Sequence, residues 1–198
     1  MKRKATFAAL AVLVACSTTD GPLNPVPAAQ LHFVQQDSVY HLLSDSASFY
    51  AKVGEDRRVE LFYRGYSSDT GEAFLQFEVH AASLLKRPDG SAFQPGDSIL
   101  ITVTVPDTNT FDFVFSPAGL QFNPADPARL HIEYNYSNHD FNGDGHHDTE
   151  DDHARSLLNV WRREPPDTLW TSQGASNSEE FEDLETAILS FSHYAVAW

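Results

Sequence analysis

One short stretch of the chain concentrates groups that could bind a metal ion. Residues 140–151 read DFNGDGHHDTED. Calcium-binding loops place oxygen ligands at positions 1, 3, 5, 7, 9 and 12, with glycine at position 6 for a sharp turn. Gly145 stands at the sixth position. The oxygen donors at the other positions belong to Asp140, Asn142, Asp144, the backbone carbonyl of His146, Asp148 and Asp151. Carboxylate and carbonyl oxygens suit calcium, so this spacing predicts one Ca²⁺ site.

The order Asp-x-Asn-x-Asp-Gly, with Asp151 at the twelfth position, resembles the loops of EF-hand proteins, dockerins and thrombospondin-type repeats. Only one such loop is present, and His147 stands where paired EF-hand loops usually carry an apolar residue. The resemblance therefore implies an isolated calcium clip that supports the fold. It implies neither a calcium sensor pair nor an active site.

Two other interpretations of this loop stay open. The first is a solvated acidic turn that binds no ion. The second is a transition-metal site, because imidazole suits zinc, copper or nickel. Four histidines crowd the segment: His139, His146, His147 and His153.

The start of the chain has the features of an export signal. Residues 2–4 are basic, and the apolar run that follows is shorter than the roughly 20 residues that span a bilayer. Residues 13–16, Leu-Val-Ala-Cys, resemble the bacterial lipobox. This resemblance implies that residues 1–15 are a lipoprotein signal peptide and that Cys16 is lipidated. Ser17 after the cysteine then favours the outer membrane, whereas an ordinary signal peptide with a chance cysteine is the alternative.

The composition is acidic, with 13 Lys and Arg against 28 Asp and Glu and a formal net charge of −15. Such a charge repels nucleic acid and anionic lipid head groups and favours cations. The only cysteine, Cys16, cannot form an internal disulfide, so the fold must rely on its core or on bound ions. Residues 16–30, rich in Ser, Thr, Pro and Ala, are expected to form a flexible tether.

Residues 31–198 alternate apolar and polar side chains with a period of two, which is typical of half-buried strands. The clearest segments are residues 73–80, 99–105, 111–115, 130–136 and 193–198. Pro and Gly turn signals separate them, so we expect an all-β fold, an antiparallel β-sandwich forming one domain. One short helix is expected after the acidic loop, capped by Thr149, and residues 177–189 could form a second helical turn.

Residues 114–134 resemble the turn-and-strand pattern of ZU5-like β-sandwich domains. The matching positions are Pro117, Gly119, Phe122, Pro124 and Leu130. The likeness covers residues 70–198, with Gly119 expected in a turn and Phe122 in the core. Bacterial proteins of this type are mostly surface or periplasmic modules without known catalysis. Some ZU5 domains cleave themselves at His-Phe-Ser, but residues 190–192 read Ser-Phe-Ser, so no self-cleavage is expected.

The sequence contains no nucleophile elbow, no zinc-protease motif and no phosphate-binding glycine loop. We therefore expect a non-catalytic envelope lipoprotein rather than an enzyme. The membrane would be reached through the Cys16 anchor, and the expected partner is an envelope protein or a glycan. The alternatives are a hydrolase that uses paired carboxylates and a carbohydrate-binding protein that stacks Trp161 and Trp170 on sugar rings.

Two or more acyl chains anchor a protein stably to a membrane, so lipidation of Cys16 has a simple consequence. Cys16→Ala should abolish labelling by a palmitate analogue and move the protein from the detergent-soluble membrane fraction to the soluble fraction. Ser17→Ala is the control and should change neither result. A Cys16→Ala protein that is still labelled and membrane-bound would contradict the lipoprotein prediction.

Overall fold

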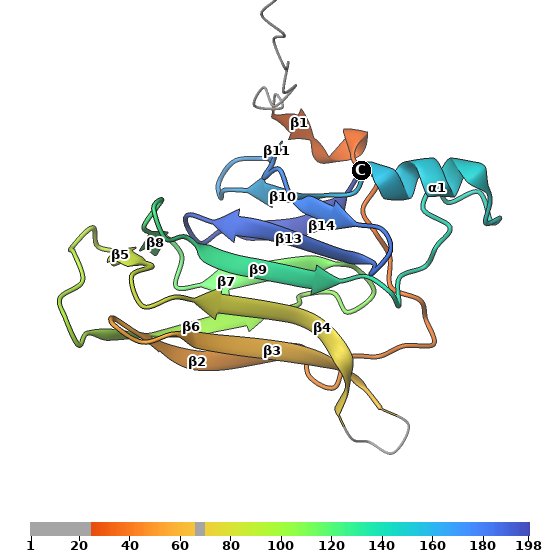
Figure 1. The fold of residues 1–198 in the computed structure, drawn as a ribbon. Helices are drawn as coiled ribbons and strands as arrows, with labels where there is room; N and C mark the ends of the chain where they lie inside the picture. The colour runs from red at the N-terminus through yellow and green to blue at the C-terminus, as the bar shows by residue number, and fades with distance from the viewer. Residues whose placement is uncertain (1–24, 66–69) are drawn as a thin grey trace, which may run out of the picture.

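Two antiparallel sheets pack face to face in a computed structural model that describes residues 25–65 and 70–198 (Figure 1). The predicted all-β class and antiparallel sandwich are confirmed. A single α-helix, α1 (Thr149–Ser156), occurs in the described residues and lies at one end of the sandwich. No helix of the described residues has the length and apolar character needed to span a bilayer.

The larger sheet has seven strands, and every neighbouring pair is antiparallel. In spatial order these are β1 (Val26–Pro27), β11 (Leu169–Ser172), β10 (Asn159–Arg163), β14 (His193–Ala197), β7 (Asp112–Ser116), β6 (Ser98–Thr104) and β2 (Ser46–Lys52). The last strand, β14, therefore lies in the middle of the sheet.

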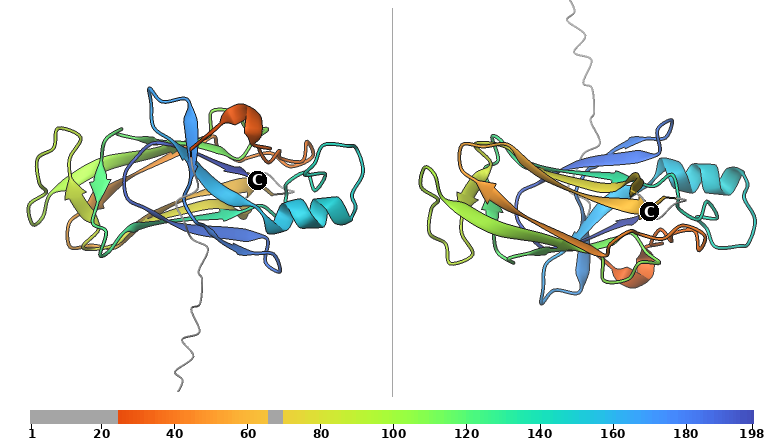
Figure 2. Two further views of the ribbon diagram at one scale, coloured as in Figure 1. Left: turned by 90° about the horizontal axis from the view of Figure 1, so that it is seen from above. Right: turned by 90° about the horizontal axis from the view of Figure 1, so that it is seen from below.

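The smaller sheet has five strands. In spatial order these are β12 (Ser176–Ser178), β13 (Asp183–Ile188), β9 (Ala128–Glu133), β4 (Thr70–Val79) and β3 (Arg57–Arg64). Two further strands, β5 (Leu84–Lys86) and β8 (Gln121–Phe122), pair at the end opposite α1, and a short 3-10 helix, η1, covers Ala28–Gln30 (Figures 1 and 2).

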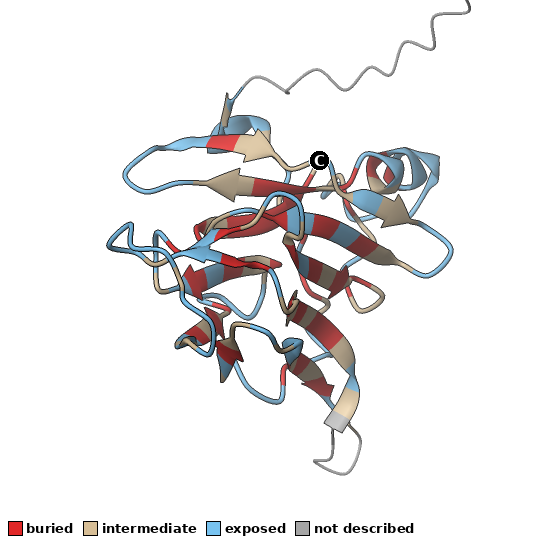
Figure 3. Cartoon of the chain, turned by 60° about the vertical axis from the view of Figure 1, so that its left-hand side comes forward, coloured by how far each residue is buried: buried red, intermediate tan, exposed pale blue. Residues whose placement is uncertain are grey.

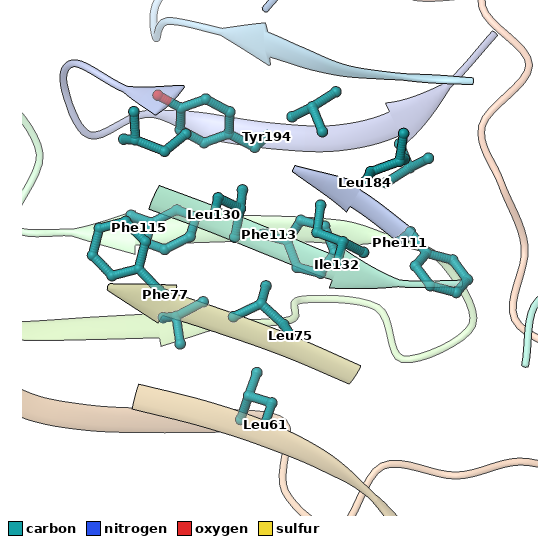
Figure 4. Close-up of a cluster of buried hydrophobic side chains, with 14 of the residues drawn as sticks. Leu61, Leu75, Phe77, Phe111, Phe113, Phe115, Leu130, Ile132, Leu184 and Tyr194 are labelled. Carbon is teal, nitrogen blue, oxygen red and sulfur yellow. The ribbon is translucent and has the colours of Figure 1, made fainter. Parts of the chain in front are cut away.

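Inward-pointing side chains of both sheets meet in one hydrophobic core, and buried and exposed residues alternate along the strands (Figures 3 and 4). Phe77 of β4 is fully buried, and its ring centroid lies 4.9 Å from that of Phe115 and 5.5 Å from that of Phe191. Each such side chain contributes roughly 1.5–3 kcal/mol by leaving water. This aromatic layer therefore joins the two sheets.

The alternation predicted that only every second side chain of residues 73–79 faces the core. Leu75 and Phe77 do, but Phe74 is also fully buried. The pairing of β3 with β4 shifts register on both sides of Phe62, and such a bulge bends and twists a strand. Phe74 is thereby packed against Phe111, with ring centroids 5.3 Å apart.

The expected short helix is present as α1, with one difference in its start. Its N-cap is Asp148, not Thr149, because the Asp148 carboxylate accepts a hydrogen bond from the Glu150 amide. The second helical turn is not formed. Residues 177–189 instead include β13, which pairs with β9 along six positions and buries Leu184 in the core.

The expectations for Gly119 and Phe122 agree with the structure. Gly119 has φ of +82°, a conformation that side-chain-bearing residues rarely adopt. Phe122 is buried in the core, with its ring centroid 5.1 Å from that of Phe191. Both residues have structural roles that fit a β-sandwich.

The first described residues cover part of the outer face of the larger sheet. β1 pairs with β11, and Phe33 packs in a second apolar cluster with Trp161 and Trp170. Residues 26–30 belong to the predicted tether and form β1 and η1. The predicted signal peptide and Cys16 lie outside the described residues.

Candidate metal centre

The acidic loop connects the five-stranded sheet to α1 at one end of the sandwich (Figure 1). Its beginning is fixed to the fold by three contacts. The Asn138 amide donates to the Gln35 carbonyl at 2.8 Å, the Phe141 side chain is buried in the core, and the Trp198 indole Nε1 donates to the Phe141 carbonyl at 3.2 Å. The C-terminal residue of the chain therefore helps to hold the loop.

The end of the loop is fixed through α1. Ala154 is buried against the core, and the Arg155 guanidinium lies 3.4 Å from the Glu182 carboxylate. The Asn177 side-chain amide donates to the Arg155 carbonyl at 2.8 Å. The loop is thus held at both ends, and only its middle projects into solvent.

Within the loop, the Asp140 carboxylate is the centre of a tight turn. Its Oδ1 accepts the amides of Gly143 at 2.8 Å and Asp144 at 3.0 Å, and its Oδ2 accepts the amide of Gly145 at 2.8 Å. Gly145 has φ of +88°, which explains why glycine occupies this position. The backbone is therefore wound around the carboxylate that the sequence places first.

The next predicted ligands also turn toward the loop backbone. Asn142 Oδ1 accepts the Asp144 amide at 2.9 Å, Asp144 Oδ1 accepts the His146 amide at 2.8 Å, and Asp148 Oδ1 accepts the Glu150 amide at 2.8 Å. A carboxylate has about four lone-pair sites, so each aspartate retains free acceptor capacity. That capacity is what an ion would use.

Asp151 closes the loop from inside the protein. It is fully buried, its Oδ1 accepts the Asn142 amide at 3.1 Å, and its Oδ2 accepts the Asp148 amide at 3.0 Å. Burial raises the pKa of this carboxyl, but hydrogen bonds from the Asp148, Asn142 and Phe141 amides outweigh burial, so its pKa lies below the ordinary value. Asp151 is therefore held as a carboxylate that ties the start of the loop to the start of α1.

The oxygen donors of the loop suit calcium, but their carboxylates do not converge on one position in this structure. In the described residues, no group of three or more His, Cys, Asp and Glu side chains is arranged so that it could hold a metal ion. Asn142 and the His146 carbonyl would complete the predicted ligand set. An ion bound here would therefore have to draw the carboxylates of the loop together.

The four histidines do not converge on the loop. His146, His147 and His153 are exposed. His139 is partly buried, stacks on Phe141 with ring centroids 5.8 Å apart, and lies 3.6 Å from the Glu182 carboxylate. The His139 and His147 ring centroids lie 6.0 Å apart, but no group of three or more His, Cys, Asp and Glu side chains in the described residues is placed to hold a metal ion.

The two tryptophans proposed for sugar stacking are both buried. Trp161 is 8% exposed and Trp170 is 3% exposed. The Trp161 indole donates to the Ala197 carbonyl at 3.0 Å, and the Arg163 guanidinium covers the Trp170 ring at 5.0 Å. Neither ring therefore offers an open face to a sugar.

A second polar cluster was not anticipated from the sequence. His193 contacts both Asp112 and Arg163, and the Ser192 hydroxyl donates to the Arg163 carbonyl. Both ring nitrogens of His193 are therefore engaged. Asp112, Arg163 and His193 lie far apart in the sequence, on β7, β10 and β14, so only the strand order brings them together.

No protein-family model, no curated protein sequence and no solved structure matches this chain. Function is therefore inferred from the chain's own residues.

The buried Asp151 carboxylate gives a testable prediction for the loop without any ion. Asp151→Asn should lower the melting temperature in EDTA, because a backbone amide that donates to the carboxylate would meet an NH₂ group instead of an acceptor. Since the folded pKa of Asp151 is lowered, the stability from its charge is fully present above about pH 4 and is lost as pH falls through the folded value. Between pH 7 and pH 3, the melting temperature of the variant should therefore fall less than that of the wild type.

Glu150→Gln is the matched control, since Glu150 is exposed and lies in the same helical turn. It should melt close to the wild type at pH 7. Equal melting temperatures for Asp151→Asn and Glu150→Gln at that pH would contradict the role assigned to Asp151.

Proposed function

We propose that the protein is a non-catalytic, lipid-anchored envelope module whose β-sandwich is stabilised by one calcium ion. The candidate ligands are Asp140, Asn142, Asp144, the His146 carbonyl, Asp148 and Asp151. The ion supports the fold and takes part in no reaction.

The observation that carries the proposal is the inward turn of the loop. Asp140 alone accepts three loop amides, and Asn142 and Asp144 each accept one more. Hydrogen bonds of this kind pre-orient carboxylates while leaving lone pairs free. The loop is also fixed at both ends to the sandwich, so an ion bound there would stabilise the whole domain.

Electrostatics give calcium a reason to bind. Residues 140–151 carry five carboxylates, four of them aspartates of the predicted ligand set, which repel one another, and the chain as a whole is strongly acidic. A divalent cation relieves this repulsion. Asp151 replaces the bidentate glutamate of an EF-hand, and no second loop of this pattern occurs in the sequence, so we expect the affinity range of extracellular modules, about 10⁻⁴–10⁻³ M.

The envelope assignment rests on two sequence features. The lipobox at Cys16 supports a lipid anchor in the outer membrane, and the ZU5-like pattern over residues 114–134 supports a binding or structural module rather than an enzyme. The sandwich fold is compatible with that likeness. An envelope protein or a glycan is the partner class that follows, and the acidic charge disfavours nucleic acid.

Calcium should raise the melting temperature. At about 1 mM calcium and a dissociation constant near 10⁻⁴ M, binding adds about 1.4 kcal/mol to the free energy of unfolding, which corresponds to a rise of a few degrees. Magnesium should raise it less, because it demands a stricter octahedral geometry. Differential scanning calorimetry of the wild type in EDTA, calcium and magnesium measures all three values.

Asp144→Ala should abolish the rise, whereas Glu150→Ala, an exposed carboxylate of the same segment outside the ligand set, should keep it. Far-UV circular dichroism should remain that of a β-protein in both variants. A wild type that melts at the same temperature with and without calcium would make the loop a solvated acidic turn. Stabilisation by micromolar zinc but not by calcium would assign the histidines as ligands.

A further inference from the structure

A pocket of about 350 Å³ opens on the outer face of the seven-stranded sheet. The first described residues cover part of that face, and Phe33 and Gln35 of this segment line one side of the pocket. Its charged and aromatic lining also includes Asp107, Asp112, Arg163, Trp170 and His193. This volume falls in the range of small-molecule sites, about 300–1,000 Å³.

The polar side chains of this pocket come from adjacent strands. Arg163 of β10 lies directly opposite His193 of β14, and Ala195 of β14 lies opposite Asp112 of β7. All of these side chains point to the same face, because residues two apart on a strand share a side. The register of three neighbouring strands therefore builds the cluster.

The hydrogen bonds of the cluster fix the Arg163 side chain. An arginine can only donate, so its Nη2 donates to His193 Nδ1 at 2.6 Å. The proton of the neutral imidazole then lies on Nε2, which donates to the Asp112 carboxylate. Arg163 also lies over the Trp170 ring, with its guanidinium carbon 5.0 Å from the ring centroid. The guanidinium is thus held on two sides.

Arg163 nevertheless has no anionic partner. It forms no ion pair with any described Asp or Glu side chain, and its Nε is a buried donor without an acceptor. The indole Nε1 of Trp170, which is also buried, likewise lacks an acceptor in the described residues. Arg163, which is partly buried, thus contacts only a neutral imidazole and an aromatic ring and has no direct anionic partner among the described residues.

We propose that this pocket binds a small monocarboxylate, whose carboxylate pairs with Arg163 and whose apolar body lies against Phe33. Arginine is suited to this task, because its planar fork matches a carboxylate and forms charge-assisted hydrogen bonds. The ligand would supply the negatively charged partner that the Arg163 guanidinium lacks.

The charge around the pocket limits the ligand class. Asp107 and Asp112 place two further carboxylates in the lining, which would repel a phosphate dianion more than a monoanion. Stacking on a sugar is disfavoured, because Arg163 lies over the Trp170 ring, and Phe33 and His193 meet it edge-on at 5.3 and 5.2 Å. A singly charged acid with an apolar body fits best.

The test compares benzoate with benzamide, its uncharged analogue, by saturation-transfer NMR on the full chain in EDTA, where the calcium proposal plays no part. Benzoate should bind, and benzamide should bind at least about tenfold more weakly, a difference of about 1.4 kcal/mol. Arg163→Gln should weaken the binding of benzoate to a similar extent. Arg129→Gln, which removes the same charge from an exposed ion pair with Glu185, should leave benzoate binding unchanged.

The comparison of the two ligands on the wild type stands even if Arg163→Gln fails to fold, which far-UV circular dichroism would reveal. Equal binding of benzoate and benzamide would overturn the proposal, as would a folded Arg163→Gln protein that binds benzoate as tightly as the wild type. No benzoate signal up to about 10 mM, a concentration that detects even millimolar affinity, would also overturn it. Binding of methyl glucoside without benzoate would replace it with a sugar site.

Discussion

The aromatic layer between the two sheets is the constraint on which the other features of the molecule depend. Phe77 from the smaller sheet packs against Phe115 and Phe191, and Phe115 meets Tyr194 at 5.7 Å, so the layer is continuous across the sandwich. Interiors are packed as densely as organic crystals, which fixes how the sheets lie against each other. With no internal disulfide to hold the fold, this packing is its main support.

This packing holds both candidate sites in position, although neither site lies inside the core. The acidic loop is attached at the end of the sandwich, where Phe141 enters the core and the indole of Trp198 binds the Phe141 carbonyl. The carboxylate pocket lies on the outer face of β14, a strand whose other face carries Tyr194 into the core. A rigid scaffold thus holds two polar sites on its surface, as is common for loops and sheet faces that bind ligands.

Much of the fold was predictable from the sequence, because period-two alternation and turn residues are local signals. The tight turn of the loop was predictable for the same reason, since Asp140 and Gly145, which form it, lie within twelve residues, whereas the calcium site remains a prediction. The predictions that were wrong concern features set by strand pairing between residues distant in the sequence. These are the bulge that buries Phe74 and the pairing with β9 that places β13 within residues 177–189. The meeting of Arg163 with His193 depends on strand order, so no local pattern could have indicated that pocket.

Whether the acidic loop closes around one calcium ion can be seen in a crystal structure grown at saturating calcium. One ion is expected, with oxygen ligands at about 2.3–2.6 Å contributed by Asp140, Asn142, Asp144, the His146 carbonyl, Asp148 and Asp151. Asp151 should remain buried at the start of α1. Density that contains only water between these side chains, or a metal held by the histidines instead, would contradict the account.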